Sequence, residues 1–209
     1  MYWNTVSPLL KSILLDLMKE ELFSPFRLVG GTALSLQFGH RLSVDIDLFT
    51  DIEYGSIDFV QIKDFLVKRY PYCIYRTIDL VSFGTFFEVG TSKDDFVKID
   101  IYYSDKFVFN QLIDYNVRLA IAEEIIAMKL EVINNKGRKK DFWDIHFFLE
   151  KYTLQHFIQI YEKRYPYGNS KTIEQQLLDF ELADNDFDPI CLLNKEWELI
   201  KYDFVDKFS

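Results

Sequence analysis

The chain contains two short runs, Gly30-Gly31-Thr32-Ala33-Leu34 and Val44-Asp45-Ile46-Asp47-Leu48-Phe49, that indicate both its fold and its chemistry. The second run alternates apolar and acidic residues, which is the pattern of a β-strand. Alternate side chains of a strand project from one face, so Asp45 and Asp47 point the same way, with Cα atoms roughly 6–7 Å apart. Two carboxylates this close repel each other unless a cation lies between them. The run predicts a metal site, and a surface strand with an outward polar face is the alternative.

The glycine pair predicts a tight turn that leads from a short strand into a helix. Gly30 and Gly31 permit a close approach to the backbone, and the free N–H groups at the start of a helix bind anions. Thr32 is suited to cap this helix or to bind a phosphate oxygen, and Arg41 could reach a phosphate with its two-pronged guanidinium. We therefore predict that these four residues bind a nucleotide. The alternative is that the glycines serve the geometry of the turn alone.

A third carboxylate, Asp100, lies in a predicted strand over residues 96–102. If this strand neighbours the strand of Asp45 and Asp47, three carboxylates converge. Such a trio can hold one or two Mg²⁺ ions and leave positions open for water and phosphate oxygens. One carboxylate could also accept the proton of an attacking hydroxyl. A solvated aspartate on the strand is the alternative for Asp100.

A second charged cluster follows in the later part of the chain. Lys129 lies within a largely apolar helical segment, where a cation needs a partner. Asp141 and Asp144 are three residues apart and so share one face of a helix. The helix start also carries a positive patch, made of Lys136, Arg138, Lys139 and Lys140. Lys129 and Lys140 are predicted to neutralise phosphate charge, and a capped helix with a solvated, charged start is the alternative.

Composition narrows the class of protein. The chain has 209 residues, of which 49% are hydrophobic and 17% aromatic, and this excludes a disordered protein. Its net charge of −9 argues against a general nucleic-acid coat protein. Cys73 and Cys191 are far apart and in no metal-ligand spacing, so no zinc site is indicated. Since neither a signal peptide nor a membrane span is apparent, we expect a soluble protein of the cytoplasm with no membrane partner.

The pattern of apolar residues changes character along the chain. Strands are predicted over 26–29, 44–50, 73–81, 83–89 and 96–102, with helices over 32–38 and 56–70, and Ser56 as the cap of the second helix. The remainder is predicted to be helical over 120–134, 140–151, 153–164, 173–180 and 195–208. We therefore predict an α+β fold, with a mixed-sheet core at residues 1–112 and an α-helical region at 113–209.

Taken together, these motifs resemble the AbiEii/AbiGii-type toxin family of nucleotidyltransferases, within the DNA polymerase β-like superfamily. The resemblance is carried by the Gly30–Leu34 run, by Asp45-x-Asp47-Leu48-Phe49 and by Arg138-x-Lys140-Asp141-x-x-Asp144-Ile145. It extends from about residue 10 into the C-terminal segment. The chain departs from the family in having Thr32 where many relatives have serine, and in lacking an arginine directly before Gly137.

The resemblance implies a nucleotidyltransferase fold and a Mg²⁺-dependent transfer of a nucleotide from an NTP to an acceptor. The acceptor would be an RNA, such as the 3′ end of tRNA, or a protein hydroxyl. The metal ligands would be Asp45 and Asp47, with Asp100 as our own added candidate. Lys129 and Asp141 join these three as predicted catalytic residues. The predicted nucleotide-binding residues are Gly30, Gly31, Thr32, Arg41, Lys129, Arg138, Lys140 and Asp144.

Members of this family act as toxins in abortive infection or toxin–antitoxin systems, which implies a cognate antitoxin as a partner. Two other functions remain open at this point. A catalytically silent protein could bind a nucleotide or a partner on the same fold. A phosphohydrolase could use the same metal site.

Overall fold

The structure, a computed structural model, describes residues 1–75 and 83–208. Its strands are β1 (Arg27–Leu28), β2 (Asp45–Thr50), β3 (Tyr72–Tyr75), β4 (Gly84–Ser92), β5 (Asp95–Tyr103), β6 (Gln111–Asp114) and β7 (Val117–Ala120). Its α-helices are α1 (Pro8–Leu17), α2 (Gly30–Phe38), α3 (Phe59–Arg69), α4 (Ala122–Asn134), α5 (Lys139–His146), α6 (Leu154–Arg164), α7 (Ile173–Leu177) and α8 (Trp197–Phe208). Short 3₁₀ helices lie at Trp3–Thr5, Glu21–Phe23, Ser170–Thr172 and Ala183–Asn185.

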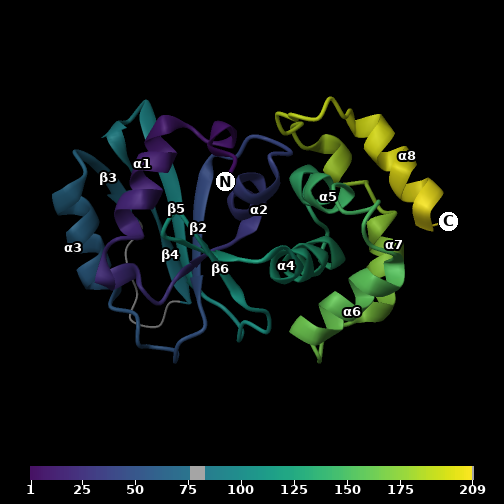
Figure 1. Cartoon of the computed structure of the whole chain (residues 1–209), viewed down its shortest axis with the longest axis horizontal. Coiled ribbons are helices and arrows are strands. Elements are labelled where there is room, and N and C mark those ends of the chain that lie inside the picture. Colours follow the sequence, from purple (N-terminus) through teal and green to yellow (C-terminus); the bar gives the residue numbers. More distant parts are fainter. Residues whose placement is uncertain (76–82, 209) are drawn as a thin grey trace.

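The described strands form one mixed sheet in the order β3-β4-β5-β2-β1-β7-β6. Strand β2 runs parallel to β5 and β1 parallel to β7, whereas the other neighbouring pairs are antiparallel. Helices α1 and α3 lie on one side of this sheet, and α2 lies on the other side with α4 to α8 beyond it (Figure 1). The mixed sheet followed by a helical part confirms the predicted α+β fold.

The two faces of β2 have opposite roles. Ile46 and Leu48 are fully buried in the hydrophobic core, and α1 contacts both β2 and β5. Asp45 and Asp47 alternate with them and project from the opposite face. Strand β5 lies directly beside β2 and places Asp100 opposite Asp47 in the register. The condition under which the three carboxylates would share one sheet face is therefore met.

The later boundary of the sheet differs from the prediction. The helical region was expected from residue 113, but this residue lies in a hairpin formed by β6 and β7, and the first helix beyond it starts at Ala122. Tyr115 and Asn116 have φ values of 48° and 62°, which allow the tight turn of a two-residue hairpin. Pairing with β1 then holds β7 within the sheet. Sequence periodicity could not show this long-range pairing.

Two further details concern the first part of the chain. The predicted cap at Ser56 is wrong, since α3 begins after Asp58, whose carboxylate accepts a hydrogen bond from the Gln61 N–H at 2.9 Å. The predicted strand over 73–81 is present from Tyr72 to Tyr75, and the rest of it lies outside the described residues. In the described part of the chain, no helix is both long and apolar enough to cross a membrane.

Candidate active site

The glycine pair forms the start of α2, directly against two charged side chains. Gly30 has a φ of +68°, a conformation that side chains disfavour. A Cβ atom at Gly30 would lie 2.3 Å from Oδ2 of Asp47, and one at Gly31 would lie 2.0 Å from Nη2 of Arg41. Both positions therefore require glycine because charged groups pack against the backbone. Contact of this turn with phosphate stays a prediction.

Thr32 is more deeply buried than its predicted role in capping the helix or binding phosphate requires. Its side chain is fully buried, and its hydroxyl donates to the Asp45 carbonyl and contacts the Ser43 Oγ at 2.7 Å. Val29 is the residue before α2 and provides no side-chain cap. In this structure Thr32 thus ties α2 to the start of β2, and its contact with phosphate is not tested.

The three predicted carboxylates share one face of adjacent strands. Asp47 is directly opposite Asp100, and Asp45 is opposite Lys98. Lys98 Nζ lies 2.6 Å from Oδ2 of Asp100, and Lys140 Nζ lies 3.9 Å from Oδ2 of Asp45. The face therefore combines three acidic groups with nearby ammonium groups, and Lys98 was not among the predicted residues.

The surroundings of Asp47 disfavour its charge. Burial and the neighbouring carboxylates of Asp100 and Asp45 raise the pKa of Asp47, whereas Lys129 and Lys140 lower it, and the resulting value is about 6. A carboxyl with this pKa keeps its proton to a higher pH than an ordinary aspartate, although it is mostly ionised at pH 7. A bound cation would favour the ionised form and relieve this repulsion.

Asp144 is the centre of a buried ionic cluster. Its carboxylate accepts from Arg41 Nε at 2.6 Å, from Arg41 Nη2 at 2.9 Å and from His40 Nε2 at 2.8 Å, and it pairs with Lys129 Nζ at 2.9 Å. Burial alone would raise the pKa of Asp144, but its cationic neighbours hold it well below the ordinary value. Asp144 and Arg41 are buried against each other. Their contact with a nucleotide stays a prediction.

Lys129 has the partners that its apolar segment led us to expect. Its ammonium lies 2.5 Å from Oδ1 of Asp141 in addition to its contact with Asp144. Burial lowers the pKa of Lys129, but the two aspartates outweigh this effect and raise it overall. Asp141 also accepts a hydrogen bond from the backbone N–H of Arg138 at 3.0 Å and so caps α5. Lys129 is therefore a permanently charged group held in a fixed position.

The positive patch at the start of α5 is divided in the structure. Lys140 faces Asp45, and burial together with the nearby charges of Lys129 and Arg138 lowers the pKa of Lys140. The exposed Arg138 lies 3.4 Å from Asp186, and the buried Lys139 lies 2.7 Å from Asp188. Of the basic residues of this patch, Lys140 is the one that the structure brings to the carboxylates.

A cleft of about 730 Å³ opens beside these groups. Gly30 and Asp47 contribute one part of its wall, and Lys129 of α4 contributes another. Aromatic and apolar side chains supply most of the remaining surface, among them Phe49, Tyr54, Phe83, Tyr103, Ile125, Met128, Val132 and Tyr165. Asp105 and Glu131 line the cleft as well, so charged groups lie within a mostly apolar wall, which suits a ligand with both characters.

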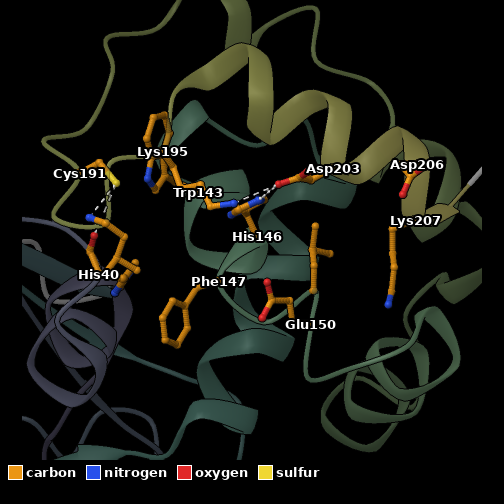
Figure 2. Close-up of a pocket in the computed structure, with 12 residues that line it drawn as sticks. His40, Trp143, His146, Phe147, Glu150, Cys191, Lys195, Asp203, Asp206 and Lys207 are labelled. Carbon is orange, nitrogen blue, oxygen red and sulfur yellow. Dashed lines mark hydrogen bonds and ion pairs between the residues drawn. The ribbon is translucent and has the colours of Figure 1, made fainter.

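A second cavity, of about 380 Å³, lies between α5 and α8 (Figure 2). His146 of α5 contacts Asp203 of α8 at 2.7 Å, and Lys195 lies 3.4 Å from the same carboxylate. His40 lines this cavity and also belongs to the Asp144 cluster. None of the described residues that line it was predicted from the sequence as a site residue.

The donor groups at the sheet fit a divalent metal. Carboxylate oxygens are hard ligands of the kind that Mg²⁺ prefers, and Asp45 and Asp47 present them on one strand face. The raised pKa of Asp47 marks charge that a cation would compensate. Among the described residues, no group of three or more histidine, cysteine, aspartate or glutamate side chains is placed to hold a metal ion together. Asp45 and Asp47 are therefore the pair that we consider.

Sequence reasoning missed Lys98 and His40. Lys98 could have been found, because it lies two residues from Asp100 and thus on the same strand face. His40 gave no such signal, since its contact with Asp144 joins residues 104 positions apart.

Similar proteins of known fold provide an independent comparison. The crystal structure of JHP933 from Helicobacter pylori has a TM-score of 0.62 at 21% identity and covers 93% of this chain and 85% of its own. The nucleotidyltransferase toxin MenT4 from Mycobacterium tuberculosis H37Rv has a TM-score of 0.56 at 11% identity and covers 94% of this chain and 82% of its own. At these identities the likeness shows a shared fold.

Comparison of sequences gives the family. The protein aq_aa25 of Aquifex aeolicus (strain VF5) is 29% identical over 163 residues, which span 76% of this chain and 75% of that protein. Residues 12–207 match the family described as "Nucleotidyl transferase AbiEii toxin, Type IV TA system". The resemblance seen in the motifs is thereby confirmed, and the chain belongs to the AbiEii nucleotidyltransferase toxin family.

Proposed function

We propose that this protein is a Mg²⁺-dependent nucleotidyltransferase that transfers a nucleotide from an NTP to a hydroxyl of an RNA, such as the 3′ end of a tRNA, or of a protein. The observation that best supports this function is the cleft whose lining combines Asp47 and Lys129 with aromatic side chains. A triphosphate with its metal needs the charged groups, and a nucleobase suits the aromatic surface. Membership of the family agrees with this activity.

The charged side chains in and beside the cleft divide the chemical tasks. Asp45 and Asp47 would hold Mg²⁺, which when bound neutralises charge on the triphosphate. Lys129 and Lys140 add positive charge beside the same oxygens. One of the carboxylates on this sheet face takes the proton from the acceptor hydroxyl. The hydroxyl oxygen forms a bond to the α-phosphorus, and the bond to the β-phosphate breaks and releases pyrophosphate.

The N-terminus of α2 supports phosphate binding beside Asp47, in the same part of the cleft wall. Gly30 lines the cleft and precedes free backbone N–H groups of the helix. These groups favour an anion at this place because the helix dipole is positive there. Since glycine leaves no Cβ atom between the backbone and Asp47, metal ligand and phosphate donors can lie close together.

The apolar lining of the cleft supports base binding. Phe83 is 71% exposed and stacks obliquely with Tyr54 at a centroid distance of 5.1 Å. Met128 and Val132 of α4 line the cleft as well. An exposed ring beside apolar side chains is a suitable platform for a nucleobase, because every base offers a π-face for stacking.

Radiolabelled substrate tests the proposed reaction. The purified protein is incubated with each NTP labelled at the α-phosphate, with Mg²⁺, and with either total tRNA or a cell lysate. We expect the label to appear on an RNA or protein acceptor. Asp45→Asn and Asp47→Asn should abolish the transfer, whereas Asp94→Asn, in the exposed turn between β4 and β5, should not. Transfer that persists in both site variants would contradict the proposal, and release of free phosphate would favour a phosphohydrolase instead.

We further propose that the protein acts as the toxin of a pair with a cognate antitoxin. The family description, a type IV toxin–antitoxin system, supports this partner. Expression in a bacterium should arrest growth, and Asp47→Asn should relieve the arrest at equal protein level. Equal toxicity of the variant would refute a role of nucleotidyl transfer in toxicity.

A further inference from the structure

The carboxylate face of the sheet contains a cation of its own. Lys98 and Asp100 alternate along β5 and stand opposite Asp45 and Asp47 of β2. Four side chains thus occupy a square on one sheet face, with three carboxylates and one ammonium group. Neighbouring strands lie about 4.8 Å apart, so each side chain is within reach of the other three.

The ammonium group of Lys98 is engaged with one member of this square. Its Nζ donates to Oδ2 of Asp100 at 2.6 Å, a short charge-assisted hydrogen bond. The Lys98 ammonium also lies 5.3 Å from the centroid of the Phe86 ring, which favours a cation at this place. Asp100 is the less exposed partner, with 17% of its side chain accessible against 41% for Lys98. The lysine therefore covers the carboxylate from the solvent side.

The other lysines near the square have different partners. Lys129 is committed to Asp141 and Asp144, and Lys140 lies 3.9 Å from Asp45, beyond hydrogen-bond distance. Lys98 is therefore the ammonium group that occupies a carboxylate oxygen of the square. A divalent ion on the same oxygen would be repelled by this charge and would have to displace it.

We propose that Lys98 holds Asp100 in place of a second divalent ion, so that the site takes a single ion on Asp45 and Asp47. Lys98 is thus a positioning residue that sets the number of bound metals. This inference rests on the proposed function, since it requires that Asp45 and Asp47 bind the metal.

Manganese binding to the nucleotide-free protein tests the number of ions. Mn²⁺ is titrated into the full chain, and electron paramagnetic resonance reports the free ion and hence the bound stoichiometry. We expect one tightly bound ion in the wild type and none in Asp47→Asn. Lys98→Met removes the charge but keeps an unbranched side chain, and it should raise the number to two. Asp100→Asn should leave the number at one, because Asp100 is not a ligand of the ion.

Matched variants separate this effect from a general change of charge. Lys93→Met alters an exposed lysine in the adjoining turn and should leave one ion bound, and Lys98→Arg should do the same because it keeps the positive charge. Circular dichroism verifies that each variant is folded, and Lys98→Gln replaces Lys98→Met if the latter is not. Two ions in the wild type, none in the wild type, or one ion in the folded uncharged variant would overturn the inference.

The stoichiometry does not depend on catalysis. If one ion binds to the wild type and two bind to Lys98→Met but no NTP is transferred, the inference holds and the proposed function fails. If the wild type transfers label but already binds two ions, the function holds and the inference fails.

Discussion

Replacement of Asp47 by asparagine should stabilise the metal-free protein above pH 6 while it abolishes activity. Burial and two neighbouring carboxylates raise the pKa of Asp47 from 3.8 to about 6. In the unfolded chain this carboxyl loses its proton near its ordinary value, whereas the folded state retains the proton to higher pH. The contribution of this group to stability is therefore fully present below the unfolded pKa and is lost as the pH rises through about 6.

The size of the effect follows from the shift in pKa. Each unit of pKa corresponds to about 1.4 kcal/mol, so the change from 3.8 to about 6 corresponds to roughly 3 kcal/mol of unfavourable free energy at pH 8. Asparagine has nearly the same shape and no charge, so it avoids this cost. For a domain of this size, roughly 3 kcal/mol would raise Tm by about 6–12 °C.

Urea denaturation at pH 5 and pH 8 in the presence of a chelator measures the difference. At pH 8 Asp47→Asn should exceed the wild type by roughly 3 kcal/mol, and at pH 5 the gap should shrink to about 1.6 kcal/mol. Asp94→Asn serves as the control and should follow the wild type at both values of pH. Addition of Mg²⁺ should stabilise the wild type and leave the Asp47 variant unchanged. An Asp47 variant that is no more stable than the wild type at pH 8 without metal would refute the reasoning.

Three further perturbations test other parts of the site. Asp144→Asn leaves the buried cations around it without their charged partner and should lower the free energy of unfolding by about 3–5 kcal/mol in urea denaturation; a loss below about 1 kcal/mol would show that the cluster is not buried as described. Gly30→Ala combines a positive φ with a Cβ atom 2.3 Å from Asp47, so it should cost about 1–2 kcal/mol and weaken Mn²⁺ binding, and unchanged binding in a titration would contradict this packing. Phe83→Ala should change stability by less than about 0.5 kcal/mol but raise KM for the NTP about tenfold in steady-state kinetics, and an unchanged KM would exclude base stacking at this ring.

The parts of the site that could be predicted from sequence share a local cause. Asp45 and Asp47 occupy one face because every strand alternates its side chains, whatever the rest of the chain does. The turn at Gly30 was equally readable, since few other residues adopt a positive φ before a helix. The same rule placed Asp100 on a strand face, and the parallel pairing of β2 with β5 then brought it to Asp47.

The errors arose where distant segments decide the structure. The β6–β7 hairpin was expected to be part of the helical region, because its place in the sheet depends on pairing with β1, about 90 residues earlier. The predicted roles of Arg41 and Asp144 in nucleotide binding stay predictions. The sequence could not show that the fold turns these two side chains toward each other and buries them.

By itself, the sequence determined the α+β class, the two aspartates of one strand face and the glycine turn beside them. Only the tertiary structure decided that β5 places Asp100 and Lys98 beside Asp47 and Asp45, and that Asp144 gathers His40, Arg41 and Lys129. The physical reason is that side-chain alternation and backbone conformation are local properties of a few residues. The partner of a charge is instead set by the packing of whole elements, because a buried ion is stable only where another segment supplies the opposite charge.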